Sequence, residues 1–508
     1  MFDSKLCFLL TLFVVVVIGG SSYATLNPDN LDDGDVLWDG GGDGIYWDDP
    51  LNWYSFTDAN EGGDANQVPF VGDRAIINDG NQVDVDSSEL LSYLVLAPHW
   101  DANATSGIVN ILQGGTIGGY RLLMGGGKDG NSELNIDGGE LNLSERVRLG
   151  ANEKGVAGTS ELNIINGGNF NYTGNQGFWM GHEVNQPVIL TIEDGSTLTS
   201  TQDDWRVGGH SPAAINIIDG SLEVAARLGL GTQRDGGSQP GRATVYIGPN
   251  GSMTVGEFMD WNGWASDGDV LVDVNGGTLN LTQDDSRSWL HSAINNRRYY
   301  SRLNIRGGGL VTTSEENDNI ITGEHWDDCV TEIYIDNGTL IVHNDFGLGY
   351  EPDSGRHILN MSSGQIDVGG DFDIGVTDGS FGFFQFNSGT VTIGGALNIG
   401  SEEEDQVDMT ADATIVIDGN AIGAITSFIE SGALTAYGES SDFVIEYDGS
   451  TTTLTPVTPS RAYNPQPSDE EVLDSIDYVN PLLSWGQVPD AATHNVYFSD
   501  SFIDVNDR

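Results

Sequence analysis

The sequence predicts an all-β protein built as a single-stranded parallel β-helix. Short alternating runs of Leu, Ile and Val recur along most of the chain, and each run is broken by a glycine turn. The runs return about every 28 residues, and about three short strands fit into each unit without any helical pattern. Three strands per repeat of this length are typical of one β-helix coil. We therefore expect about 12 coils, right-handed as most parallel crossovers are.

The repeat itself is an apolar-x-apolar segment, a turn with glycine, and a second alternating run. In LNIDGGELNL, which begins at Leu134, the glycine supplies the positive φ that a sharp corner requires. A propeller is the main alternative, but its blades need about 40 residues each. The units start at Val109, Leu134, Leu162, Leu190, Ile215, Val245, Val272, Leu303, Ile333, Leu359, Phe384 and Ile415.

An asparagine recurs between the first two apolar positions of several units. Side chains alternate between the two faces of a strand, so these asparagines point away from the core. They form either a hydrogen-bonded ladder between coils or simply an exposed column. The members are Asn135, Asn163, Asn216, Asn304 and Asn360.

The charge of the chain restricts its partners. The 76 acidic and 19 basic residues give a net charge of −57, which repels phosphate backbones and excludes nucleic acid as a partner. Such a surface suits a saline exterior and attracts divalent cations weakly. We expect no cofactor beyond weak calcium binding, and we expect salt or calcium to raise stability.

The first 24 residues have the features of a cleaved signal peptide. An apolar run covers residues 6–18, and Ser22 and Ala24 form a small-x-small cleavage pattern. This run is short for a membrane span, and no later apolar stretch is long enough for a transmembrane segment. The sequence therefore predicts an exported protein, either secreted to the extracellular space or held at the cell surface.

Residues 25–105 are predicted to form a cap and the first coils. Trp38, Trp47 and Trp53 lie close together here, and they either plug the open end of the core or form an aromatic sugar platform. The run W-x-G-G-G-D-x-x-x-W-x-D-P-x-N-W, followed by V-P and G-D, resembles the opening of exported bacterial β-helix proteins. These include autotransporter-passenger-like repeat proteins of the planctomycete type. The resemblance implies a first coil or cap.

The composition changes after the repeats, which we place at residues 106–450. Residues 451–468 are rich in Pro and Thr and are predicted to be a semi-rigid linker. Residues 469–508 resemble the start of a fibronectin type III-like module, too short for a complete β-sandwich. The resemblance implies further C-terminal domains that are absent here. It rests on Leu483, Ser484, Trp485, Asp490, Ala491, His494, Val496, Tyr497 and Phe498.

The strongest functional signal is a column of arginine and tryptophan on the middle strand of each coil. Residues one and three positions before its last apolar residue face outward. In a chain this acidic, arginines concentrated on one strand face either pair with acidic neighbours or bind a ligand, through bidentate contacts to carboxylate or sulfate. Trp can stack on sugars. The candidate groove residues are Arg121, Arg146, Arg148, Trp179, His182, Trp205, Arg206, His210, Arg227, Arg287 and Trp289.

Two classes of function remain open. The first is a non-catalytic surface or matrix protein that binds polysaccharide or a cell-surface glycan, or acts as a spacer. The second is a polysaccharide lyase or glycosidase on a β-helix scaffold, for which the irregular stretch 257–300 is the expected site. No nucleophile or metal-ligand motif was found to identify catalytic residues or a metal site.

Overall fold

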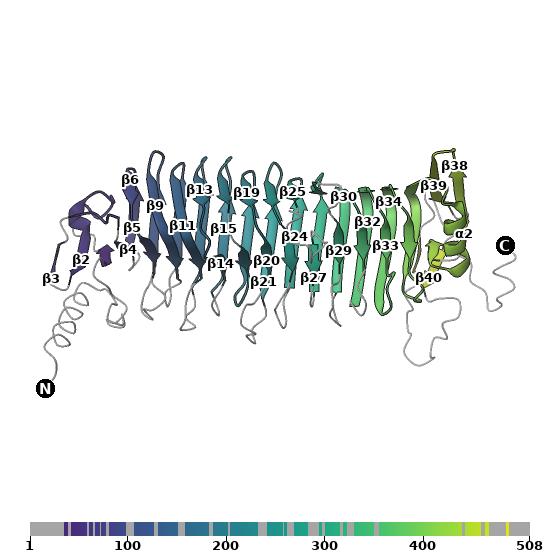
Figure 1. The fold of residues 1–508 in the computed structure, drawn as a ribbon, viewed down its shortest axis with the longest axis horizontal. Helices are drawn as coiled ribbons and strands as arrows, with labels where there is room; N and C mark the ends of the chain where they lie inside the picture. Colours follow the sequence, from purple (N-terminus) through teal and green to yellow (C-terminus); the bar gives the residue numbers. More distant parts are fainter. Residues whose placement is uncertain are drawn as a thin grey trace, which may run out of the picture.

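The computed structural model is a long parallel β-solenoid of about 11 turns, close to the predicted number (Figure 1). It describes residues 35–458, together with 463–466 and 484–486. The segments outside the description are 39–41, 58–59, 65–66, 72, 78–80, 98–105, 126–130, 151–157, 182–185, 202–203, 232–240, 258, 262–268, 283–293, 297–299, 315–318, 323–329, 350–354 and 439–441. The predicted signal peptide and most of the fibronectin-like module lie outside it.

Each coil contributes strands to three faces, as the sequence predicts, and equivalent strands of successive coils pair in parallel. The first face carries the predicted starts of the repeat units, and its strands pair in register from β5 to β36. The twelfth predicted start is wrong: Ile415 pairs with Val391 on the second face, because the last unit reaches the first face at residues 406–409. Its strands are β5 (Asn81–Val85), β8 (Gly107–Ile111), β10 (Ser132–Asp137), β12 (Ser160–Ile165), β15 (Val188–Ile192), β18 (Ala213–Ile217), β21 (Arg242–Ile247), β24 (Asp269–Asn275), β27 (Tyr300–Arg306) and the first parts of β30 (Val330–Val342), β32 (Gly355–Val368), β34 (Ser380–Ile393) and β36 (Gln406–Asp418).

The second face follows the glycine turn. Its strands are β6 (Ser88–Leu90), the first parts of β9 (Thr116–Met124) and β11 (Glu140–Leu149), β13 (Asn169–Tyr172), β16 (Thr197–Ser200), β19 (Ser221–Val224), β22 (Ser252–Val255), β25 (Thr278–Leu281), β28 (Leu310–Thr313) and the later parts of β30, β32, β34 and β36.

The third face holds the middle strands that carry the candidate site. Its strands are β4 (Arg74–Ile77), β7 (Tyr93–Leu96), the second parts of β9 and β11, β14 (Phe178–Met180), β17 (Trp205–Val207), β20 (Leu228–Leu230), β23 (Met259–Trp261), β26 (Ile294–Asn296), β29 (Ile320–Thr322), β31 (Phe346–Leu348), β33 (Phe372–Ile374) and β35 (Leu397–Ile399).

The core runs along the axis of the solenoid. In the coil that starts at β10, Leu134 and Ile136 are fully buried, while Asn135 between them is half-buried on the outside. The predicted asparagine ladder is present in the first coils only, because Asn216, Asn304 and Asn360 are paired in register with residues other than asparagine. The side-chain amide of Asn135 donates to Asn110 Oδ1 at 2.9 Å, and that of Asn163 donates to Asn135 Oδ1 at 2.9 Å. These asparagines therefore tie neighbouring coils together.

The N-terminal end is closed by the three tryptophans. Trp38 on β1 (Asp35–Trp38), Trp47, and Trp53 at the start of β2 (Trp53–Thr57) are all at most 1% exposed. The Trp53 ring lies 5.0 Å from that of Trp38 and 4.6 Å from that of Trp47, edge to face. Because the rings are buried in the core, they act as a plug and offer no sugar platform. The remaining elements here are the 3-10 turn η3 (Pro50–Asn52) and β3 (Asn60–Asp64).

The C-terminal end is covered by elements that the repeat did not predict. The helix α2 (Ile422–Ser431) buries Ile425 and ends at Gly432, whose φ of 83° lets the chain turn away. After β37 (Leu434–Ala436), the hairpin of β38 (Phe443–Tyr447) and β39 (Thr451–Pro456) pairs antiparallel with β36. Residues 451–456, expected in the linker, are thus part of the solenoid's end (Figure 1). Beyond them, β40 (Tyr463–Gln466) pairs antiparallel with β41 (Ser484–Gly486).

Candidate functional site

The register of the third face brings the predicted arginines and tryptophan into adjacent coils. Arg148 on β11 pairs with Trp179 on β14, and Trp179 pairs in turn with Arg206 on β17. Arg146, two residues before Arg148 on β11, pairs with Arg121 on β9. Since these positions all alternate with buried core residues, their side chains leave the same surface of the solenoid.

Gly177 leaves room for the Trp179 indole, which covers both its own outward position and that of Gly177 two residues earlier. The Trp179 indole folds back over Gly177, so a Cβ on Gly177 would lie only 2.2 Å from the indole nitrogen. Gly177 also has a φ of 99°, a conformation that residues with a side chain rarely adopt. In the neighbouring strand, Arg146 lies beside Gly177 and Arg148 lies beside Trp179. The ring is thereby placed among three arginines.

Three guanidinium groups gather around this one indole. The Cζ atoms of Arg148, Arg146 and Arg206 lie 4.6, 5.3 and 5.7 Å from the Trp179 ring centroid. These distances fall within the range of cation–π contacts. Trp179 is only 7% exposed, so little of the ring remains for a sugar to stack on. The indole packs against guanidinium groups, so it does not form the expected stacking platform.

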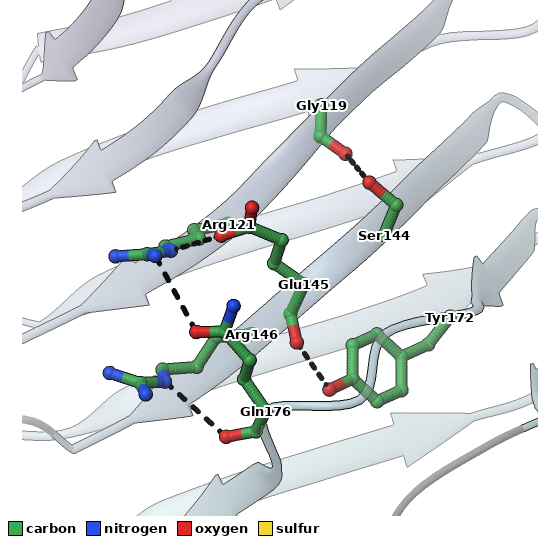
Figure 2. A network of polar contacts seen from close by, with 7 residues as sticks. All are labelled: Gly119, Arg121, Ser144, Glu145, Arg146, Tyr172 and Gln176. Carbon is green, nitrogen blue, oxygen red and sulfur yellow. Dashed lines mark hydrogen bonds and ion pairs between the residues drawn. The ribbon is translucent and has the colours of Figure 1, made fainter.

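Arg121 belongs to a polar network beside this cluster, shown in Figure 2. Its Nε donates to Glu145 at 2.6 Å, and its Nη2 reaches the side-chain oxygen of Gln176 at 3.4 Å. The Arg146 Nε donates to the backbone carbonyl of Gln176 at 3.3 Å. The alternative of pairing with acidic neighbours thus holds for Arg121, whose charge Glu145 balances.

A surface hollow of about 400 Å³ lies within the cluster. Two arginines, the tryptophan, two polar turn residues and a glycine form most of its wall, and Asp204 is the carboxylate among its lining residues. The positive groups therefore outnumber the negative ones at this point of a chain with a net charge of −57. The lining consists of Arg146, Asn175, Gln176, Gly177, Trp179, Asp204 and Arg206.

The other predicted residues have different positions. Trp205 is fully buried and stacks on Phe178 with ring centroids 3.7 Å apart, so it belongs to the core and its assignment to the groove is wrong. Arg227 is half-buried one coil beyond Arg206, where its backbone carbonyl accepts from Trp205. His210 is half-buried in the turn after β17 and is not among the residues that line the hollow. His182, Arg287 and Trp289 lie outside the described residues.

The sequence reasoning missed the residues that enter the hollow from its edge. Asn175 and Gln176 form the turn before β14, and Asp204 directly precedes β17. Their position in the sequence, just before the strands that carry Trp179 and Arg206, could have identified them. Turn residues just before a strand share the surface on which that strand's outward side chains emerge.

In a second group of arginines, which we call the balanced cluster, carboxylates neutralise the positive charges of Arg302 and Arg306. Arg302 donates to Glu332 Oε2 from Nη2 at 2.6 Å and from Nε at 3.0 Å, and Tyr300 donates to the same carboxylate. Burial and the neighbouring Glu332 raise the pKa of Tyr300 to about 12. Arg306 binds both carboxylate oxygens of Asp273, at 2.8 and 2.7 Å. These arginines serve to join adjacent coils.

The C-terminal part of the third face is acidic. Asp371 directly precedes β33, and its backbone N–H donates to Asp345 Oδ1 at 2.8 Å. The backbone N–H of Ala396 donates to Asp371 Oδ1 at 2.7 Å. Asp373 accepts from the Asn398 side chain at 2.7 Å, and burial, together with Asp371 and Asp345, raises its pKa. This part of the face therefore repels anions.

Within the described ranges, no group of three or more His, Cys, Asp or Glu side chains is arranged to hold a metal ion. No helix in the part of the chain that the structure describes is both long and apolar enough to cross a membrane. Comparison with known proteins found no match: no protein-family model, no curated protein and no solved structure matches the chain. The structure therefore assigns the protein to a fold class, the parallel β-solenoids, and shows a cluster of arginines on one of its faces.

Proposed function

We propose that this β-solenoid is a non-catalytic protein that binds an acidic polysaccharide at the cluster of Arg146, Arg148, Trp179 and Arg206. The observation that carries the proposal is the gathering of three guanidinium groups on one indole beside an open hollow. Because like charges repel, placing three guanidinium groups close together costs free energy, and the core does not require charged residues at these outward positions. Departures of this kind are expected at functional sites.

The chemistry of the cluster favours an anionic ligand over a neutral one. A guanidinium group offers paired N–H donors that match a carboxylate or a sulfate. Gln176 and Asn175 add amide groups that suit the hydroxyls of a sugar. Since Trp179 is 7% exposed, recognition of an uncharged sugar by ring stacking is not supported.

An exported protein has access to such a ligand. The apolar N-terminal run and the pronounced acidity of the chain support a secreted or cell-surface location. The excess of acid also favours selectivity, because the surface outside the cluster repels polyanions. Sequencing the N-terminus of the mature chain after expression in a bacterial export host tests the location: a start near residue 25 supports it, and an uncleaved chain contradicts it.

The binding test uses the full chain with carboxylated and sulfated polymers in parallel. Alginate and polygalacturonate supply carboxylates, dextran sulfate supplies sulfates, and dextran is the neutral control. We expect binding of at least one polyanion and none of dextran, with about a tenfold loss in Arg148→Ala, which removes a charge-assisted contact. Arg242→Ala is the matched control, because Arg242 is exposed on the first face.

The same samples distinguish the alternative function. Release of unsaturated or reducing ends from a polyanion would identify a lyase or glycosidase and overturn the non-catalytic proposal. Binding that is equal in Arg148→Ala and Arg242→Ala would move the site away from the cluster.

A further inference from the structure

Positive groups of the third face lie on four of five consecutive coils along the solenoid axis, and Trp179 occupies the remaining coil. Arg121 lies on β9, Arg146 and Arg148 on β11, Trp179 on β14, Arg206 on β17, and Arg227 just before β20. Each of these strands pairs in parallel with the next. The arginines therefore form a line two rows wide, parallel to the axis. Arg148, Trp179 and Arg206 make one row. Arg121 and Arg146 begin the other, in which Arg227 is level with Asp204.

The length of this line is set by the spacing of β-strands. Paired strands lie about 4.8 Å apart, so the four steps from β9 to β20 cover about 19 Å. The step from one coil to the next is close to the length of one sugar in an extended polysaccharide. A chain that lies along the axis thus presents about one sugar to each coil, and the hollow between Arg146 and Arg206 takes its central part.

Both ends of the line are defined by changes in charge. At the N-terminal end, Arg121 donates to Glu145 at 2.6 Å, and this carboxylate reduces the positive charge that the end of the line presents. Towards the C-terminus, the same face carries Asp345, Asp371 and Asp373. A polyanion is attracted to the coils of β9 to β20, which carry the arginines, and is repelled farther along the same face, around β31 and β33.

We infer that the ligand is a linear polyanion with anionic groups on successive sugars, lying along the axis over the coils from β9 to β20. This inference rests on the proposed function and adds the orientation and the length of the ligand. It makes Arg227 a contact for long chains only, because Arg227 lies one coil beyond the hollow-lining Arg206. Carboxylate and sulfate are both compatible with the guanidinium groups.

The test measures the affinity of the full chain for oligosaccharides of graded length, both carboxylated (oligogalacturonates) and sulfated (heparin-derived oligosaccharides). We expect affinity to rise with length until the oligosaccharide covers about 19 Å and then to level off. Arg227→Gln should weaken the binding of long oligosaccharides about tenfold and leave disaccharide binding unchanged. Arg148→Gln should weaken both, whereas the control Arg242→Gln should weaken neither.

The two proposals fail in different ways. If disaccharides bind as tightly as long chains and Arg227→Gln has no length-dependent effect, the axial arrangement is wrong and the proposed function stands. If no polyanion of any length binds to the wild-type chain, both are wrong. Circular dichroism of each variant confirms that a lost affinity reflects a lost contact. The salt dependence of binding gives a second readout, since removing one contact with a polyanion reduces its slope.

Discussion

The third face of the solenoid differs in charge between its N-terminal and C-terminal parts, although the backbone positions are equivalent. Around β11 to β17 the outward positions hold Arg148, Trp179 and Arg206, whereas around β33 they hold Asp371 and Asp373. The inward residues are apolar in both parts. Core packing therefore leaves the charge of the outward positions free to differ along the face.

The two parts also use their charged groups differently. In the C-terminal part, the carboxylates of Asp345 and Asp371 each accept a backbone N–H from the next coil, so they support the fold. In the N-terminal part, three guanidinium groups lie around an indole next to a hollow. This comparison separates carboxylates that accept backbone N–H groups between coils from guanidinium groups that gather beside a hollow. The predictions below test that separation.

The largest effect is expected when the N-terminal part is given the charge of the C-terminal part. Arg148→Asp combined with Arg206→Asp replaces two anion contacts by two repulsive charges. We expect the affinity for polyanions to fall at least about a hundredfold, because each charge-assisted bond contributes about 1.5–3 kcal/mol. Titration calorimetry with a polyanion measures it.

The control for this double variant carries the same change of net charge elsewhere. Arg242→Asp with Arg356→Asp alters two exposed arginines of the first face. A similar loss of affinity in both variants would show that only the total charge matters, and the distinction between the two parts of the third face would then be wrong.

The next effect concerns the glycine under the indole. Gly177→Ala introduces a Cβ at 2.2 Å from the Trp179 indole nitrogen and should lower the free energy of unfolding by about 2–4 kcal/mol, from overpacking and positive φ together. Gly195→Ala is the matched control: its φ is 71°, but no atom lies within 4 Å of the added Cβ. Equal destabilisation of the two variants would contradict the packing of Trp179 on Gly177. Urea unfolding measures both.

A smaller effect is expected at the balanced cluster. Glu332→Gln removes the carboxylate that binds Arg302 and should reduce the free energy of unfolding by about 1–2 kcal/mol without altering polyanion affinity. Burial raises the pKa of Glu332, but the hydrogen bonds from Tyr300 and Arg302 outweigh it, and the net pKa is lowered. The stabilisation is therefore present above the ordinary glutamate pKa and is lost as the pH falls through the lowered value. A polyanion affinity reduced as in Arg148→Ala would contradict this assignment.

The smallest effect concerns the acidic part of the face. Burial raises the pKa of Asp373, and the neighbouring Asp371 and Asp345 raise it further. The folded state then binds a proton more readily than the unfolded state, so this group favours folding at low pH and the effect is lost as the pH rises through the raised pKa. Asp373→Asn should weaken the rise in melting temperature on acidification from neutral pH. An unchanged pH profile would show that Asp373 does not contribute.

Much of the fold could be predicted because its rules are local. Strict alternation, as in Leu134, Asn135 and Ile136, identifies the inward residues of each strand, and the repeat length identifies a coil of three strands. The helix α2 was missed because its segment was treated as one more repeat unit. Its signal was present: Ile422, Ile425 and Ile429 follow a helical spacing, and Gly432 follows the last turn.

The candidate site was predicted in part, for a similar reason. Alternation correctly set Arg146, Arg148 and Arg206 on one outward surface. The same rule would have moved Trp205 into the core, since Trp205 lies two residues before the buried Val207. By contrast, no local rule predicts that Arg121 pairs with Glu145 of the next coil, because that choice depends on side-chain conformations across the strand pair.

The sequence by itself determined the solenoid, the inward and outward positions and the presence of an arginine column, because each follows from periodicity within a single strand. Only the tertiary structure decided that the Trp179 ring lies over Gly177 and is covered by three guanidinium groups. That arrangement depends on the register between adjacent coils and on the space left by a missing side chain. It changes Trp179 from a surface for sugars into a support for the arginines.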